Sequence, residues 1–256
     1  MNSVAIIFGG DIDLYVHWFN VFKNIEDAFD CVIRRRGNFN YSTRIGNTLL
    51  KFYFCINPIR DSNYLYYKLF CETVPKKLAP PPADNVAKKA AKFDRVLFFG
   101  LCGSLHNGRK GDIHTPYTFR EILFPDYFIT HKCIPAIKLS NSIQFTNFLC
   151  KKIRGKKSRV ITSNLTFMPD YIEGGSAGLI TLSTKLSSYG DIVDKEAYEI
   201  AKYLKGLPIG MVLMTSDILY NRKDMLKNNH SFKPDVSKFN KALVSSIKVA
   251  IEDDQP

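Results

Sequence analysis

The sequence predicts a single α/β domain over residues 1–256, a three-layer α/β/α arrangement with a mixed, mostly parallel central sheet. Short, fully apolar runs that end in glycine or polar residues are typical of strands buried on both faces of such a sheet. Segments with helical spacing of apolar residues alternate with these runs along the chain. We find no internal repeat and no linker long enough to divide the 256 residues, so one domain is expected.

In the first third of the chain, strands are expected at Ser3 to Phe8, Val32-Ile33 and Leu49 to Ile56. The first of them runs into Gly9-Gly10, which suits a tight turn after a buried strand. Arg34 to Asn38 is interpreted as a basic turn, and Tyr64 to Cys71 fits either a strand or a helix. A loop at Pro80-Pro81-Pro82 precedes a helix predicted over Ala83 to Lys92, with Asp84 or Asn85 near its start.

In the rest of the chain, strands are expected at Arg95 to Phe99, Val160 to Thr162, Gly190 to Val193 and Ile209 to Met214. Residues 100–103 (G-L-C-G) are interpreted as a glycine turn whose small residues let a ligand approach the backbone. Glu196 to Lys205 is predicted to form a helix between the last two strands. Apolar residues spaced three and four apart predict a closing amphipathic helix over Val236 to Glu252.

The composition is that of a globular protein, with 45% hydrophobic and 23% charged residues, which excludes an intrinsically disordered chain. The net charge of +12 comes from short, scattered basic groups, which form either a solvated surface or a polyanion site. Because no nucleic-acid-binding motif accompanies them, no nucleic-acid partner is expected. The six cysteines have no metal-binding spacing, so reduced, mostly buried thiols and no metal site are expected.

No apolar run approaches the roughly 20 residues that cross a bilayer, and the start of the chain lacks the order of a signal peptide. A cytoplasmic protein without a membrane partner is therefore expected.

Polar residues that follow apolar strands mark the edge of an α/β sheet where ligands bind. Four such places occur, at Asp11 and Asp13, at residues 100–104, at Glu196, and at Ser216-Asp217. A binding site is therefore expected at the carboxyl ends of these strands.

Three motifs in order resemble the purine nucleoside phosphorylase and methylthioadenosine/S-adenosylhomocysteine nucleosidase superfamily. They are V-L-F-F-G-L-C-G-S-L followed by G-D-I and Pro116, then V-D-K-E-A-Y-E-I-A, and then M-T-S-D. The resemblance implies the nucleoside phosphorylase-like fold, a purine nucleoside as substrate and a homo-oligomer. It also implies no cofactor, with phosphate as co-substrate if the chain is a phosphorylase. Gly100, Leu101 and Cys102 are expected to line the substrate site.

Cleaving the bond between C1′ and a purine nitrogen needs an acid near N7 and a group that steadies positive charge on the ribose. Asp217 is the candidate acid, oriented by Ser216, or alternatively the N-cap of a following helix. Glu196 is the candidate for holding the ribose hydroxyls, or alternatively a carboxylate facing a helix dipole. Lys195 stands where the resembling family usually has methionine under the ribose, which motivates the alternative of a chain that binds nucleosides without cleaving them.

The remaining site residues are expected to bind the base and to activate the nucleophile. Phe167 resembles the aromatic residue that stacks on the base, or else packs in the core. Asp13 aligns with the carboxylate that activates water, and Asp11 is its substitute. Resembling phosphorylases carry one arginine in the first glycine turn and another on the strand before the second turn. In this chain the first turn holds the two acids Asp11 and Asp13, and the second position is Phe98.

Without those arginines, phosphate would be repelled by the two acids. Hydrolysis of a methylthioadenosine- or adenosylhomocysteine-like nucleoside is therefore expected. The alternatives are a phosphorylase, in which Arg44 contacts phosphate, and an inactive nucleoside-binding protein.

Overall fold

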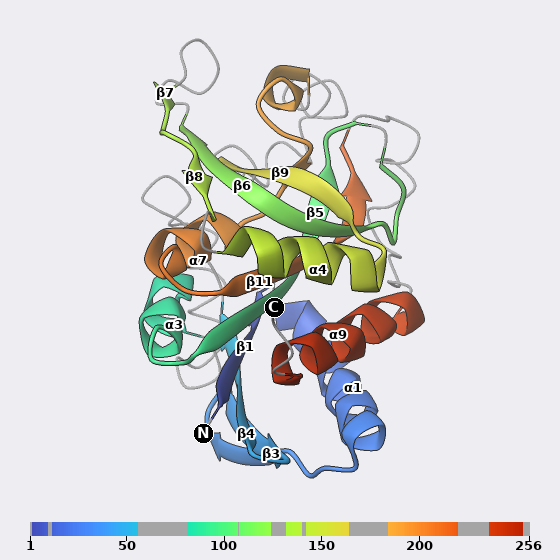
Figure 1. The fold of residues 1–256 in the computed structure, drawn as a ribbon. Helices are drawn as coiled ribbons and strands as arrows, with labels where there is room; N and C mark the ends of the chain where they lie inside the picture. Colours follow the sequence, from blue (N-terminus) through green and yellow to red (C-terminus); the bar gives the residue numbers. More distant parts are fainter. Residues whose placement is uncertain are drawn as a thin grey trace.

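The structure is a computed structural model with a mixed sheet and helices packed around it (Figure 1). It describes residues 2–9, 12–55, 81–106, 108–123, 132–139, 142–163, 184–219 and 236–252, without the side chains of 12–20, 123, 132, 133, 163, 217 and 236. The helices are α1 (Ile12–Phe29), α3 (Ala83–Ala90), α4 (Ile143–Ile153), α7 (Ala197–Leu204) and α9 (Val236–Ile251). The strands are β1 (Ser3–Gly9), β2 (Arg34–Gly37), β3 (Asn40–Ile45), β4 (Thr48–Cys55), β5 (Arg95–Ser104), β6 (Ile113–Leu123), β7 (Lys132–Cys133), β8 (Ile137–Lys138), β9 (Lys156–Ser163), β10 (Ile192–Val193) and β11 (Ile209–Ile218).

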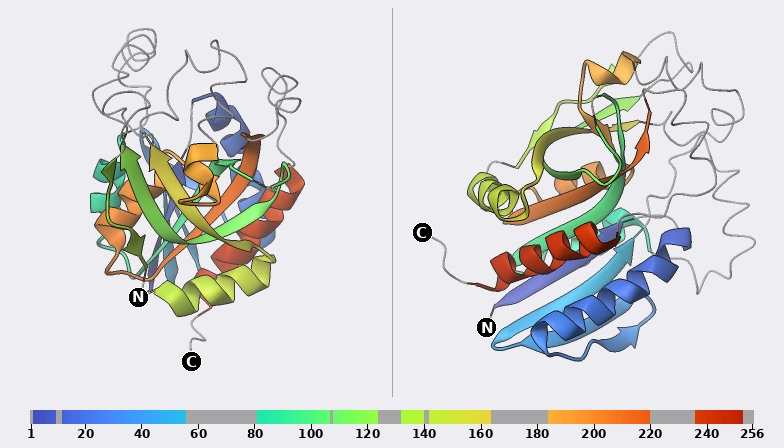
Figure 2. Two further views of the ribbon diagram at one scale, coloured as in Figure 1. Left: turned by 90° about the horizontal axis from the view of Figure 1, so that it is seen from above. Right: turned by 90° about the vertical axis from the view of Figure 1, so that its right-hand side faces the viewer.

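The sheet has a parallel centre and closes on itself at one end. Strands β4, β1, β5 and β11 lie side by side and run parallel. Beyond them, β6 is antiparallel to β11, while β9 is parallel to both β6 and β10. Because β10 also pairs with β5, strands β5, β11, β6, β9 and β10 form a closed ring (Figure 2). The mixed α/β class is confirmed, whereas a plain three-layer stack is not, because of this ring.

Alternate residues of each central strand enter two separate hydrophobic clusters. Ile6 of β1 and Phe99 of β5 face the cluster that contains α1, α4 and α9. Their neighbours Ile7 and Phe98 face the cluster that contains α3 and α7. These strands are therefore buried on both sides, which explains why their sequences are apolar at nearly every position.

Most of the predicted elements are present. The strand at Ser3 to Phe8 and that at Leu49 to Ile56 correspond to β1 and β4, and the helices at 83–92, 196–205 and 236–252 correspond to α3, α7 and α9. Asp84 lies in the first turn of α3, as expected. No described helix is both long and apolar enough to cross a membrane. Among the described cysteine side chains, none forms a disulfide.

Two predictions about the first half of the chain are wrong. Val32-Ile33 is not a strand, and Val32 is exposed. Arg34 to Asn38 is not simply a basic turn, because Arg34–Gly37 is β2 and pairs antiparallel with β3. Helix α1 and strand β3 were not predicted at all. The segment from Tyr64 to Cys71 lies outside the described residues.

The predicted glycine turn at residues 100–103 is also wrong, because β5 continues through it to Ser104. Gly100 pairs with Leu213 and Gly103 with Asp217 of β11. Glycine is needed there for space: a Cβ atom on Gly103 would lie 2.7 Å from Cδ1 of Leu219 and 3.0 Å from Cγ2 of Val193. The small residues thus mark close packing between neighbouring strands.

Candidate active site

The candidate site lies at the carboxyl end of β5, where two other strands meet it. Gly103 of β5 pairs with Asp217 of β11 on one side and with Val193 of β10 on the other. Glu196 follows Val193 by three residues. The backbones that carry the two predicted acids therefore flank one residue of the central strand.

Glu196 is buried immediately before α7. It is 4% exposed, and a Cβ atom placed on Gly9, at the end of β1, would lie 3.4 Å from its Cβ. Its side chain makes no capping hydrogen bond to α7. The alternative role of Glu196, a carboxylate facing the helix dipole, therefore gains no support from a capping contact.

Asp194 is a residue of the site that sequence reasoning missed. Its Oδ1 accepts a hydrogen bond from the backbone N–H of Glu196 at 2.9 Å and another from that of Ala197. Burial raises the pKa of Asp194 to about 6, although those N–H groups and the charge of Lys195 lower it. The signal available in the sequence was an Asp two residues before Glu196, at the start of a predicted helix.

Lys195 and Cys55 are the other titratable neighbours at this edge. Lys195 is half-buried between the two acids. Cys55, the last residue of β4, is buried, and its pKa is raised by burial and by the charges of Glu196 and Asp194. The end of β4 therefore lies near both carboxyl groups, and the Cys55 thiol stays protonated at neutral pH.

The Ser216-Asp217 pair lies within β11, not after it. The pairing of β11 with β5 shifts between Thr215 and Asp217, so Ser216 is bulged out of the register. Its Oγ donates to the carbonyl oxygen of Cys102 at 3.3 Å, which ties the bulge to β5. Because β11 continues to Ile218, the alternative of Asp217 as a helix N-cap is wrong.

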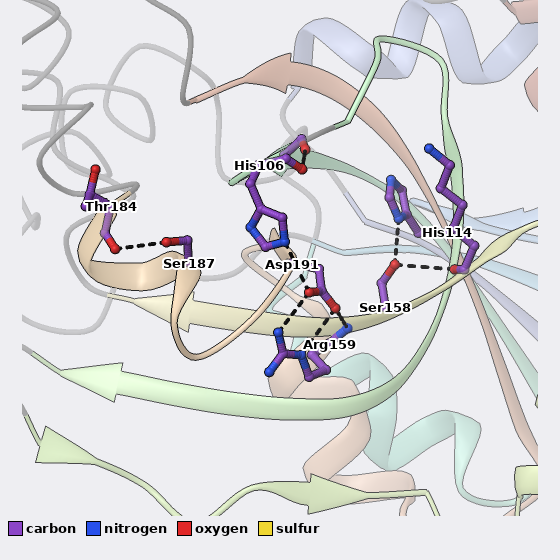
Figure 3. A network of polar contacts seen from close by, with 9 residues as sticks. His106, His114, Ser158, Arg159, Thr184, Ser187 and Asp191 are labelled. Carbon is purple, nitrogen blue, oxygen red and sulfur yellow. Dashed lines mark hydrogen bonds and ion pairs between the residues drawn. The ribbon is translucent and has the colours of Figure 1, made fainter.

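Behind this bulge, a buried histidine connects three strands of the ring. Nδ1 of His114 lies 2.7 Å from Oγ of Ser158 (Figure 3). Nε2 of His114 lies 2.9 Å from Oγ1 of Thr215. Ser158 Oγ donates to the carbonyl of Lys156, so Nδ1–H donates to Ser158 and Nε2 accepts from Thr215. Burial lowers the pKa of His114 to about 4, which keeps the ring neutral at pH 7.

A second polar contact ties β9 to the segment before β10. Oδ1 of Asp191 accepts from the Arg159 guanidinium at 2.9 Å, and His106 Nε2 lies 3.5 Å from the same oxygen (Figure 3). Hydrogen bonds from Arg159 hold the pKa of Asp191 below its usual value, although burial acts in the opposite direction. These contacts anchor the strand end from which Asp194 and Glu196 follow.

The phenyl ring of Phe98 lies between the ends of β1 and β5. Phe98 is fully buried, and Cβ atoms on Gly9 and Gly100 would lie 2.7 Å and 3.4 Å from Cζ of its ring. Leu101 packs against the hydrophobic cluster of α1, α4 and α9, and Cys102 against that of α3 and α7. Gly100, Leu101 and Cys102 thus lie at the site edge, but the side chains of Leu101 and Cys102 pack in the core.

Several predicted site residues cannot be placed fully. Asp11 and Phe167 lie outside the described residues. Asp13 is the second residue of α1, just after β1, and the side chains of Asp13 and Asp217 are outside the description. The structure therefore places Asp217 and the segment of Glu196 on either side of Gly103, and Asp13 in the first turn of the helix that follows β1. The roles of the three side chains stay predictions.

Gly9→Ala is expected to lower the free energy of unfolding by about 1–3 kcal/mol, because the new methyl group would overlap the Phe98 ring. Gly37→Ala is the matched control, since a Cβ there meets nothing within 4 Å. Urea unfolding of both variants measures the difference. Equal stability of the two variants would show that Phe98 moves aside freely.

Comparison with solved structures shows that the chain has the fold of nucleosidases, as the sequence motifs predicted. Native futalosine hydrolase of Helicobacter pylori matches with a TM-score of 0.63 and 13% identity, over 96% of this chain and 97% of that chain. A mutant of the H. pylori 5′-methylthioadenosine/S-adenosylhomocysteine nucleosidase, with 5′-methylthioadenosine in its active site, matches with a TM-score of 0.62 and 15% identity, over 97% and 99%. Arabidopsis thaliana 5′-methylthioadenosine nucleosidase matches with a TM-score of 0.55 and 13% identity, over 100% and 98%. No protein-family model and no curated protein sequence matches the chain.

Proposed function

We propose that this protein is an N-ribosyl hydrolase that cleaves the glycosidic bond of a purine nucleoside. The observation that carries the proposal is the meeting of Asp217 and the Glu196 segment on either side of Gly103. In a nucleoside the base and the sugar are adjacent. An acid that contacts the base and an acid that contacts the sugar are therefore expected to come from neighbouring strand ends. The fold shared with nucleosidases over almost the whole chain supports the same assignment.

Each acid has a distinct chemical task in the proposed reaction. Asp217 donates a proton toward N7, so that the purine leaves as a neutral base. Glu196 accepts hydrogen bonds from the ribose hydroxyls and steadies the positive charge that grows at C1′. Burial of Glu196 strengthens this electrostatic effect because little water competes with it.

Water is the proposed nucleophile, with Asp13 as its general base and Asp11 as the alternative base. Phosphate binding needs cationic side chains or free backbone amides. The Phe98 ring instead packs over Gly9 and Gly100, where the family resemblance places an arginine in phosphorylases. Two buried carboxyl groups, Asp194 and Glu196, lie at the same edge and would repel a dianion. These observations favour hydrolysis over phosphorolysis.

The proposed substrate is an adenosine derivative of the methylthioadenosine or adenosylhomocysteine kind, with Phe167 stacking on the base. A structural neighbour holds 5′-methylthioadenosine in its active site, which supports this class. The test is to incubate the protein with methylthioadenosine and with adenosylhomocysteine, with and without phosphate, and to measure free adenine. Release without phosphate is expected; release only with phosphate would make the protein a phosphorylase.

A second candidate function is nucleoside binding without cleavage. It is motivated by Lys195, a cation next in sequence to Glu196, the acid that is proposed to hold the sugar. Calorimetry with methylthioadenosine would then show binding in the absence of adenine release. Adenine release at a rate that scales with protein concentration would exclude this candidate.

A further inference from the structure

The Asp194 carboxyl group accepts two hydrogen bonds from the segment that carries Glu196. Its Oδ1 accepts the backbone N–H of Glu196 at 2.9 Å and that of Ala197, the first residue of α7. Glu196 itself makes no capping bond through its side chain. Asp194 therefore caps the first turn of α7.

Asp194 is in turn anchored to β9 through its main chain. Its N–H donates to the carbonyl of Ile161 at 3.0 Å, and Oγ1 of Thr162 donates to its carbonyl oxygen at 2.7 Å. A series of hydrogen bonds therefore links β9 to Asp194 and Asp194 to Glu196. Such a continuous connection gives Glu196 one backbone position relative to the sheet.

The second carboxyl oxygen of Asp194 shows that this residue differs from a helix cap on the protein surface. The residue is 4% exposed, and its Oδ2 is buried without a hydrogen-bond partner in the described part of the chain. The charged and titratable groups near it are Lys195, Glu196 and Cys55. A cap on the protein surface would leave this oxygen to water, whereas here it is buried.

We propose that Asp194 is a positioning residue for Glu196, fixing the backbone from which the Glu196 carboxylate reaches the sugar. The inference rests on the proposed function, because it assigns to Glu196 the contact with the ribose hydroxyls. Asp194 itself does not touch the substrate. A shift of the Glu196 carboxylate by about 1 Å is enough to weaken productive binding as much as 10²-fold.

Kinetics of two Asp194 variants test this role. Asp194→Ala removes both backbone hydrogen bonds and is expected to raise KM for methylthioadenosine roughly 10- to 100-fold. Asp194→Asn keeps an oxygen acceptor and is expected to restore KM to within about threefold of the wild type, since Asn and Asp cap helices equally well. Glu199→Gln, which changes a carboxylate in the first turn of the same helix, is the matched control with wild-type KM.

Whether a variant changes KM or only the apparent kcat distinguishes a positioning role of Asp194 from a merely structural one. A variant that is partly unfolded has less active enzyme, which lowers the apparent kcat and leaves KM unchanged. A wild-type KM in Asp194→Ala, or an equal loss in Asp194→Asn and Asp194→Ala, overturns the proposal. Should Asp194→Ala not fold, Asp194→Val, which removes the acceptor but fills most of the same space, is measured in its place, and a wild-type KM there overturns the proposal equally.

Amide hydrogen exchange separates the failure of this inference from the failure of the proposed function. If the wild type releases no adenine, the proposed hydrolase activity fails, whatever Asp194 does. The amides of Glu196 and Ala197 still report on positioning, because Asp194 accepts both. Loss of their protection in Asp194→Ala, with protection kept in Asp194→Asn, supports the inference, and unchanged protection in Asp194→Ala overturns it.

Discussion

Asp217→Asn is expected to lower the rate of purine release by roughly 10²- to 10⁴-fold while leaving the fold intact. The amide has the shape of the carboxylic acid but cannot give a proton to N7, so the purine must leave as an anion. The main chain at this position pairs with Gly103 of β5, and this pairing does not depend on the side chain. Steady-state kinetics with methylthioadenosine measure the effect, and urea unfolding measures the stability.

Asp84→Asn is the matched control for this substitution. Asp84 lies on α3, outside the strands that carry the candidate site, and forms an ion pair with Lys88 at 3.1 Å. It is expected to keep the wild-type rate, because an exposed ion pair contributes little even to stability. Wild-type purine release by Asp217→Asn would remove Asp217 as the acid and leave the proposed mechanism without a proton donor.

Acid is expected to destabilise the protein through His114 by roughly 3 kcal/mol between pH 7 and pH 4. Burial lowers the pKa of this histidine to about 4 in the folded protein, below its ordinary value of 6.5. Between these two values the unfolded chain binds more protons than the folded chain, so the free energy of unfolding falls as the pH falls. The loss begins below about pH 6.5 and is complete near the folded-state pKa.

Urea unfolding of the wild type and of His114→Gln at pH 7.5, 6.0 and 5.0 isolates this contribution. Glutamine is neutral throughout, so the other titrating groups cancel when the two pH dependences are subtracted. The wild type is expected to lose more stability on acidification than the variant. Parallel curves for the two proteins would show that His114 takes up its proton in the folded state without cost.

The strands of the sheet centre could be predicted because they are buried on both faces. The runs from Ser3 to Gly9 and from Ile209 to Met214 are apolar at nearly every position, which few other structures require. Strand β3 (N-Y-S-T-R-I) was missed because it lies toward the edge of the sheet, pairs with basic β2 and mixes polar with apolar residues. Helix α1 was missed because aromatic and β-branched residues are frequent in it, and these residues favour strands.

The site could be predicted in part, because strand ends and acids are visible in the sequence while packing between strands is not. Glu196 was found as a carboxylate that follows an apolar strand. Gly100 and Gly103 were interpreted as a turn, since the side chains that require them to be small come from distant segments, including Leu213 and Leu219. Asp194 was overlooked because its importance comes from its burial and from hydrogen bonds that form only in the folded chain.

The closure of the ring has a consequence for how copies of this chain can meet. Strand β2 ends the long path of paired strands, and no other described strand pairs with its outer side. It is only four residues long, and Arg34, Arg35 and Arg36 on it are all exposed. Two such strands brought together would place six arginines in contact, and like charges at a sheet edge oppose pairing. Any assembly of this protein is therefore expected to form through its helices or loops rather than by joining sheets.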